Sequence, residues 1–168
     1  ANLFTYVNFT VGSTPIRAVF KAGGGMESIF GDSGSGGGIP TMIQSSVYAE
    51  TWRGDDALYC SIRRHHLSVA QPRFRRSNSA PVNPVTPVPG SFSVEYVKRV
   101  GLDPTMQWVR TQDHSKWAVA QSTPWACYGG MNRERSQWRR GGEFFCLNSA
   151  NLNEAMKKVI VEHESCSL

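Results

Sequence analysis

The stretch Leu3-Phe4-Thr5-Tyr6-Val7-Asn8-Phe9-Thr10-Val11 alternates apolar and polar residues and is rich in β-branched and aromatic types, as is typical of a β-strand. A turn at Gly12-Ser13-Thr14-Pro15 leads to a second predicted strand, Ile16 to Phe20. A two-stranded ribbon is only marginally stable alone, so these strands need a larger sheet. The sequence also begins at Ala1 without a methionine, which favours a piece released from a longer polypeptide. We therefore expect residues 1–30 to complete a β-sandwich supplied by another chain.

The composition is that of an ordinary, moderately basic domain. The chain has 168 residues, 40% of them hydrophobic, and a formal net charge of +5, which favours acidic partners. No apolar run approaches a membrane span and no signal peptide is recognisable. The cysteines show no metal-binding or disulfide spacing, and we expect free thiols in a reducing compartment: Cys60, Cys127, Cys146 and Cys166.

Three segments are predicted along the chain. Residues 1–30 form strands, 31–44 are a Gly-rich linker, and 45–168 form a small α+β domain with an Arg/Pro-rich arm at 71–90. Further strands are predicted at 92–97, 106–111, 116–120 and 144–147. A C-terminal amphipathic helix is predicted to begin at an Asn151 cap, with one apolar face made by Leu152, Ala155, Met156, Val159 and Ile160. The fold class is therefore mainly β.

Three clusters could carry chemistry, and each has a simpler structural interpretation. The segment Gly31-Asp32-Ser33-Gly34 is similar to a protease nucleophile loop, but no histidine precedes it. His65 and His66 are adjacent, so on a strand they face opposite ways and do not share a metal. Asp113-His114-Ser115 occupies a predicted hairpin turn, where these residue types are common. We expect no catalytic residue, no metal site and no cofactor.

The arginines are the remaining candidates for binding. An arginine beside an aromatic side chain can contact phosphates and bases, as in the segment around Trp138. The candidate contacts with an anionic partner are Arg63, Arg64, Arg73, Arg75, Arg76, Arg133, Arg135, Arg139 and Arg140. A basic surface without a fixed partner is the alternative. The five tryptophans are expected to fill the core.

The N-terminal segment resembles the last two strands of a picorna-like viral jelly roll. The matching residues are Leu3-Phe4-x-Tyr6-Val7, then Pro15 to Gly24, then Met26-Glu27. The pattern is similar to that of insect iflavirus major capsid proteins, some of which add a protruding domain resembling residues 92–161. The resemblance implies that assembly depends on strand residues Leu3, Phe4, Tyr6, Val7, Ile16, Val19 and Phe20.

The resemblance implies a virion structural protein, assembled in the host cytoplasm into an icosahedral homo- or hetero-oligomer. Its partners would be other capsid chains, with viral RNA or a host receptor as further candidates. Some protruding domains carry a hydrolytic Trp-His-Ser group, but this chain has Trp52-Arg53-Gly54 there, so we expect no enzyme. Two alternatives stay open: a basic RNA-binding module, and a serine/histidine hydrolase domain.

Overall fold

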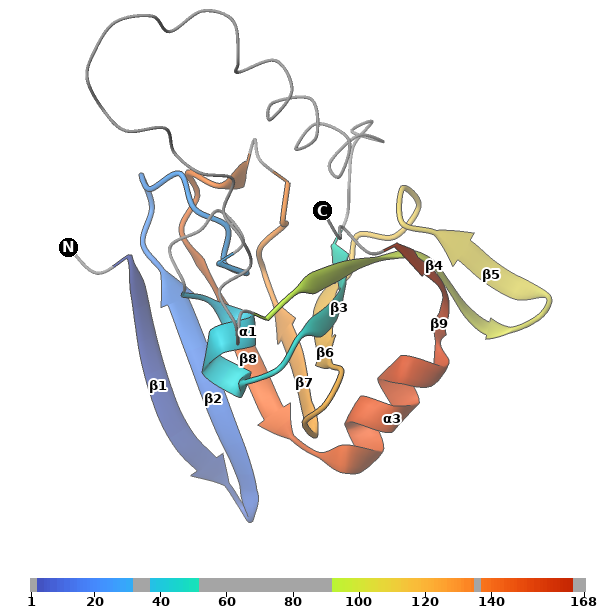
Figure 1. Ribbon diagram of the computed structural model, residues 1–168, viewed down its shortest axis with the longest axis horizontal. Coiled ribbons are helices and arrows are strands. Elements are labelled where there is room, and N and C mark those ends of the chain that lie inside the picture. Colours follow the sequence, from blue (N-terminus) through green and yellow to red (C-terminus); the bar gives the residue numbers. More distant parts are fainter. Residues whose placement is uncertain (1–2, 32–36, 52–91, 135–136, 165–168) are drawn as a thin grey trace, which may run out of the picture.

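The fold is mainly β, as the sequence predicts, with one large mixed sheet and two helices among the described residues (Figure 1). The computed structural model describes residues 3–31, 37–51, 92–134 and 137–164. The helices are α1 (Ile39–Ile43) and α3 (Ala150–Lys158). The strands are β1 (Phe4–Val11), β2 (Thr14–Lys21), β3 (Val47–Thr51), β4 (Val94–Asp103), β5 (Met106–Val109), β6 (Lys116–Ala120), β7 (Trp125–Gly129), β8 (Gly142–Asn148) and β9 (Ile160–Glu164).

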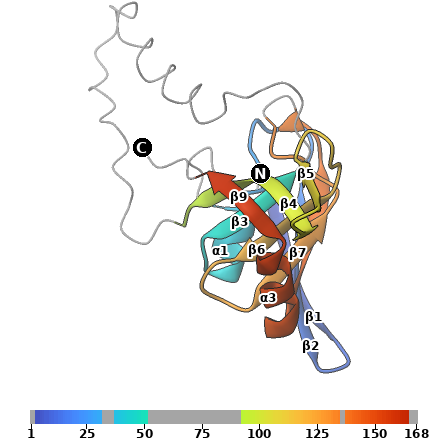
Figure 2. The same ribbon diagram turned by 90° about the vertical axis from the view of Figure 1, so that its right-hand side faces the viewer.

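The nine strands follow the order β1-β2-β8-β7-β6-β3-β4-β5, and β9 pairs with β4. Only β3 and β4 run parallel; the other described pairs are antiparallel. Seen from the side in Figure 2, the β1–β2 ribbon extends beyond the rest of the sheet. The parallel pair is joined through the segment 52–91, which lies outside the described residues together with the predicted arm at 71–90.

The predicted pairing of residues 1–30 with another chain is wrong. Strand β2 pairs with β8 of the same chain, from Ile16 opposite Leu147 to Lys21 opposite Gly142. The β1–β2 ribbon is therefore part of a sheet formed by its own chain. Two facing sheets, as in a jelly roll, do not occur among the described residues. Of the residues expected to contact a partner chain, Val19 is buried in the chain's own core and Phe4 packs against it, while Tyr6, Val7 and Phe20 are about 40% exposed.

Part of the predicted 31–44 linker is a helix. Pro40 stands in the first turn of α1, where a missing N–H costs nothing, and Ile39 and Ile43 are fully buried. The N–H of Gly38 donates a 3.0 Å hydrogen bond to the Tyr6 hydroxyl, which fastens the helix to β1. Helix α1 is therefore part of the core and not of a linker.

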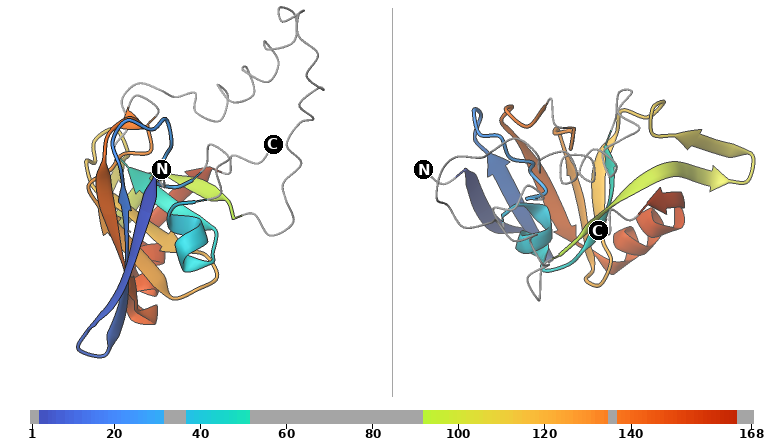
Figure 3. Two further views of the ribbon diagram at one scale, coloured as in Figure 1. Left: turned by 90° about the vertical axis from the view of Figure 1, so that its left-hand side faces the viewer. Right: turned by 45° about the horizontal axis from the view of Figure 1, so that its top comes forward.

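The two helices cover opposite faces of the sheet, as the right-hand view of Figure 3 helps to show. On one face, α1 packs with Val47, Ala49 and Ala118; on the other, α3 packs over Trp117 and Val119. Residues alternate between faces along a strand, so Ala118 and Val119 supply the two cores. Trp117 and Trp125 are buried, as expected of core residues. Neither helix in the described ranges is long and apolar enough to span a membrane.

Helix α3 exists as predicted, with two differences at its ends. Its N-cap is Ser149, whose hydroxyl accepts the Leu152 N–H, and not Asn151. The helix ends at Lys158, and Ile160 already belongs to β9, so the chain returns to the sheet instead of ending in a helix. Leu152 and Met156 pack against Trp117 and its neighbours, as the apolar periodicity predicts.

The expectation of free thiols is wrong for two cysteines. Cys127 on β7 and Cys146 on β8 are paired in register and form a disulfide. Such cross-links persist in oxidising compartments, which removes the argument for a reducing one. Cys60 and Cys166 lie outside the described residues.

Asn153 provides a test of how α3 is attached. Its side-chain amide is 3% exposed and donates to the carbonyl oxygens of Ala120 and Trp125, at 3.0 and 2.8 Å. We predict that Asn153→Ala lowers the free energy of unfolding by about 2–4 kcal/mol, because two buried carbonyls lose their donor. Urea unfolding measures this. The exposed neighbour variant Asn151→Ala should stay within about 0.5 kcal/mol of the parent; equal losses for both variants would contradict the assignment.

Candidate functional site

Four strand ends meet at one edge of the sheet. Thr51, the last residue of β3, lies opposite Lys116, the first of β6. β7 ends at Gly129, opposite Phe144, and β8 begins at Gly142. Antiparallel pairing places the end of one strand beside the start of the next. The turn before β6 and the connection from β7 to β8 therefore share this edge.

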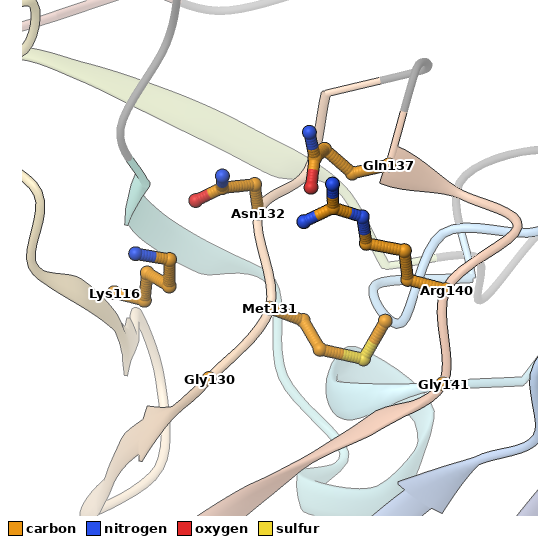
Figure 4. Close-up of a pocket in the computed structure, with 7 residues that line it drawn as sticks. All are labelled: Lys116, Gly130, Met131, Asn132, Gln137, Arg140 and Gly141. Carbon is orange, nitrogen blue, oxygen red and sulfur yellow. The ribbon is translucent and has the colours of Figure 1, made fainter.

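A pocket of about 290 Å³ opens at this edge (Figure 4). Figure 4 shows the side chains of Asn132, Gln137 and Arg140 on the β7–β8 connection, with Lys116 across from them at the start of β6. The lining residues are Lys116, Gly130, Met131, Asn132, Gln137, Arg140 and Gly141. Met131 forms the floor because Gly142 leaves room for it: a Cβ on Gly142 would lie 2.5 Å from Met131 Cγ.

The pocket is built to receive an anion. Lys116 and Arg140 are both cationic, and none of the seven lining residues carries a carboxylate. The Oδ1 atom of Asn132 is buried and has no hydrogen-bond partner among the described residues, and as an acceptor it would face a donor and not the anion. Asn and Gln side chains can also donate N–H groups to an oxyanion. Two cations with two amide side chains suit a phosphate group.

The turn before Lys116 is held rigidly by Asp113. Its carboxylate accepts the Trp108 Nε1–H at 3.0 Å and the Ser115 backbone N–H at 2.8 Å. Burial alone would raise the pKa of Asp113, but these hydrogen bonds and the nearby His114 outweigh it, so the pKa of Asp113 is lowered. The Lys116 ammonium donates a 2.7 Å hydrogen bond to the His114 carbonyl. The side chain of His114 is exposed, and its backbone carbonyl is the group that contacts this pocket residue.

A second carboxyl, Glu50, lies beneath this turn. It is 1% exposed, and its Oε1 atom has no hydrogen-bond partner among the described residues. Burial, helped by the charge of Asp113 and opposed by that of Arg110, raises the pKa of Glu50 to about 8. At neutral pH Glu50 is therefore mainly uncharged, because the cost of burying its charge outweighs the attraction of Arg110.

Arg133 supports the pocket from behind. It is 2% exposed, and its guanidinium lies 4.4 Å from the Tyr96 ring centroid. Its backbone N–H donates to Thr51 Oγ1, and its carbonyl accepts the Trp138 Nε1–H at 2.7 Å. The expectation that Arg133 is an exposed arginine is wrong, and its place behind the pocket fixes the neighbouring Asn132.

The structure brings together only part of what the sequence singled out. Asp113 and His114 lie in the turn before Lys116, and Arg140 lines the pocket. Arg139 is exposed and its Nε donates to Met26 Sδ at 3.1 Å. Ser33, His65, His66, Arg53, Gly54 and the arginines at 63, 64, 73, 75, 76 and 135 lie outside the described residues. No group of three or more His, Cys, Asp or Glu side chains that could hold a metal ion occurs in the described ranges.

Comparison with known proteins identifies the family. The family model for deoxyribonuclease II matches residues 35–166. The chain belongs to the deoxyribonuclease II family. It is 31% identical over 131 residues to plancitoxin-1 of Acanthaster planci, covering 77% of this chain and 30% of that protein. It is 29% identical over 162 residues to deoxyribonuclease-2-alpha of Sus scrofa, covering 92% of this chain and 37% of that protein. The chain thus spans about a third of the length of these relatives.

Membership of the deoxyribonuclease II family overturns the capsid interpretation. The chain is not a viral structural protein, and the expected virion location, icosahedral oligomer and capsid partners are wrong. The expectation that it belongs to no enzyme class is also wrong, because the relatives are named as deoxyribonucleases. Of the alternatives, a hydrolase fits the family best, although its nucleophile Ser33 lies outside the described residues.

Sequence reasoning missed Lys116 and Asn132, and it dismissed His114 as an ordinary turn residue. A usable signal was present: a histidine and a lysine two residues apart where a strand begins, with Gly130-Met131-Asn132 after the following strand. The turn interpretation was correct for the backbone, since Asp113 does shape a turn. A turn at a sheet edge is also where side chains reach a ligand.

Glu50 should make stability depend on pH. The folded chain keeps the Glu50 proton up to about pH 8, whereas the unfolded chain releases it near the ordinary value of 4.5. The free energy of unfolding should therefore fall as pH rises between these values. In the parent, the free energy of unfolding should fall by an amount on the order of a few kcal/mol between these two pH values. We predict that Glu50→Gln abolishes this fall, as measured by thermal unfolding from pH 4 to 9.

The matched control is Glu154→Gln, because Glu154 is exposed on α3. This variant should keep the pH dependence of the parent. Parallel stability–pH curves for the parent and Glu50→Gln would show that Glu50 ionises normally and would contradict the prediction.

Proposed function

We propose that this chain carries a phosphodiester-cleaving site of a deoxyribonuclease II-type nuclease. The observation that carries the proposal is the cationic pocket of Lys116, Arg140, Asn132 and Gln137, in which Lys116 donates a hydrogen bond to the backbone carbonyl of His114. The pocket offers charge and N–H donors for a phosphate, and the histidine offers an imidazole that can act as a nucleophile or carry a proton. DNA as substrate is supported by the printed names of several relatives.

Each pocket residue has a part in this proposal. Lys116 and Arg140 bind the non-bridging oxygens of the scissile phosphate and stabilise the charge that develops in the transition state. Asn132 and Gln137 orient the same group by hydrogen bonding. His114 attacks phosphorus while the bond to the leaving oxygen breaks, or it donates a proton to that leaving oxygen, roles for which an imidazole is suited. Asp113 keeps the His114 turn in place through Ser115 and Trp108.

The disulfide supports a proposal about location. Cys127 and Cys146 link β7 to β8 directly below the pocket connection. A structural disulfide is stable outside the reducing cytosol. We place the proposed nuclease in an oxidising compartment, in contrast to the cytoplasmic assembly expected from the sequence.

The arginines predicted to contact an anion enter the proposal unequally. Arg140 contacts the phosphate in the pocket, and exposed Arg139 extends the cationic surface beside it. Arg133 is excluded from this role by its burial.

Substitution of His114 and Lys116 tests the function. We predict that His114→Asn lowers the rate of plasmid DNA cleavage by about 10²–10⁴-fold, because proton transfer or attack is lost. Lys116→Met should weaken DNA binding and also slow cleavage, because the Lys116 charge contacts the phosphate both in the bound substrate and in the transition state. Both are measured as kcat and KM in the protein that contains this chain, over pH 4–8.

The controls are a histidine and a lysine outside the pocket. His163 pairs with Glu95 on the far part of the sheet, and Lys158 is exposed at the end of α3. His163→Asn and Lys158→Met should keep the parental kinetics within about threefold. Full activity of His114→Asn with intact folding would remove the proposed site.

A further inference from the structure

Lys21 is a buried cation for which the proposed chemistry has no use. It is the last residue of β2 and is only 3% exposed. Its ammonium donates to four backbone carbonyls: Trp138 at 2.6 Å, Arg140 at 2.9 Å, Ala22 at 3.1 Å and Gly25 at 3.3 Å. Burial lowers the pKa of Lys21, and the charge of Glu27 opposes this. Burying a charge is costly unless it is fully hydrogen-bonded, so this arrangement is specific.

The four carbonyls belong to two segments that are far apart in sequence. Ala22 and Gly25 are in the turn that follows β2, and Trp138 and Arg140 are in the pocket connection. The segments also meet directly, because the Gly24 N–H donates to the Arg139 carbonyl at 2.8 Å. The ammonium therefore lies between two loops and holds both.

The close approach of the loops depends on Gly141. A Cβ there would lie 3.0 Å from the backbone N of Gly23 and 3.0 Å from the Lys21 carbonyl oxygen. The glycine turn after β2, which the sequence suggested was a jelly-roll closure, thus packs on the loop that lines the pocket. Removing the ammonium would leave four carbonyl dipoles converging on a buried point without a donor.

We propose that Lys21 is a positioning residue that sets the phosphate affinity of the pocket by fixing the backbone of Arg140. It holds the Arg140 carbonyl itself, and the Arg140 N–H in turn donates to the Gln137 carbonyl at 2.9 Å. Lys21 therefore orders the segment that carries two of the pocket's side chains without lining the pocket. This inference rests on the proposed function, since it assumes that Arg140 binds a phosphate.

The test is a double-mutant cycle on DNA binding. The 168-residue chain is titrated with a fluorescently labelled 12-base-pair DNA duplex at several salt concentrations, using Lys21→Met, Arg140→Gln and the double variant. Each single variant should weaken binding about tenfold and reduce the slope of log K against log salt by about one, the value of one phosphate contact. The double variant should bind no more than about twofold more weakly than Arg140→Gln, because both changes remove the same contact.

The control for charge is Lys98→Met, which removes one positive charge from β4, where Lys98 pairs with Glu162. It should keep the parental affinity and salt slope. Thermal unfolding confirms that each variant is folded at the titration temperature, and a reduced folded fraction lowers the amplitude of binding but not its salt slope. If Lys21→Met does not fold, Lys21→Gln, which keeps two donors, replaces it in the same cycle.

Two failures are distinguishable. If Arg140→Gln weakens binding but the Lys21 variant does not, or if the two effects are additive, the positioning role is overturned and the proposed function stands. If Arg140→Gln and Lys116→Met both leave DNA binding unchanged, the phosphate pocket itself is wrong, and the inference falls with it.

Discussion

The antiparallel ladder through β3, β6, β7, β8 and β2 is the constraint on which the rest of the structure depends. Each pairing reverses the chain direction, so the ends of β3, β7 and β2 lie at the same edge as the starts of β6 and β8. This edge collects residues that are far apart in the chain, with Lys21 opposite Gly142, more than a hundred positions away, and Thr51 opposite Lys116. The disulfide between Cys127 and Cys146 joins the two strands from which the pocket connection emerges. The register between the strands therefore places the residues of the candidate site next to one another.

Buried polar groups then fix the geometry around that edge. Lys21 holds the pocket loop from one side, and Arg133 holds it from behind through Thr51 and the Tyr96 ring. Asp113 shapes the turn that carries His114, using two hydrogen bonds that keep its pKa low. Glu50 has no such donors at Oε1, so burial keeps it protonated. The hydrogen-bond donors around each carboxyl therefore decide whether it is charged. Asp113 and Glu50 are neighbours, yet the pKa of Asp113 is lowered and that of Glu50 is raised.

The capsid interpretation failed for a physical reason that can be stated residue by residue. The alternation in Phe4–Val11 correctly predicts a strand, but not a buried face, because every residue of β1 after Phe4 is exposed. It contains no information about which strand lies alongside, and the partner of β2 is β8, more than a hundred residues away. Short aromatic strands and Gly-rich turns occur in many β folds, so a resemblance built on them matched local structure and not ancestry. The family match to deoxyribonuclease II rests on residues 35–166, which include the segment 92–161 that the resemblance assigned to a protruding domain.

The sequence by itself determined what depends on neighbours along the chain. The strands at β1, β2 and β6 follow from alternation, and α3 follows from the spacing of Leu152, Met156 and Val159. The turn at Asp113-His114-Ser115 also follows from local residue preferences. Only the tertiary structure decided what depends on contacts across the sheet: the Cys127–Cys146 disulfide, the burial of Arg133 and Lys21, and the meeting of Lys116 with Asn132 and Arg140 in one pocket. Local periodicity fixes the face on which a side chain lies, whereas register between distant strands fixes its neighbours, and the candidate chemistry of this chain is a property of those neighbours.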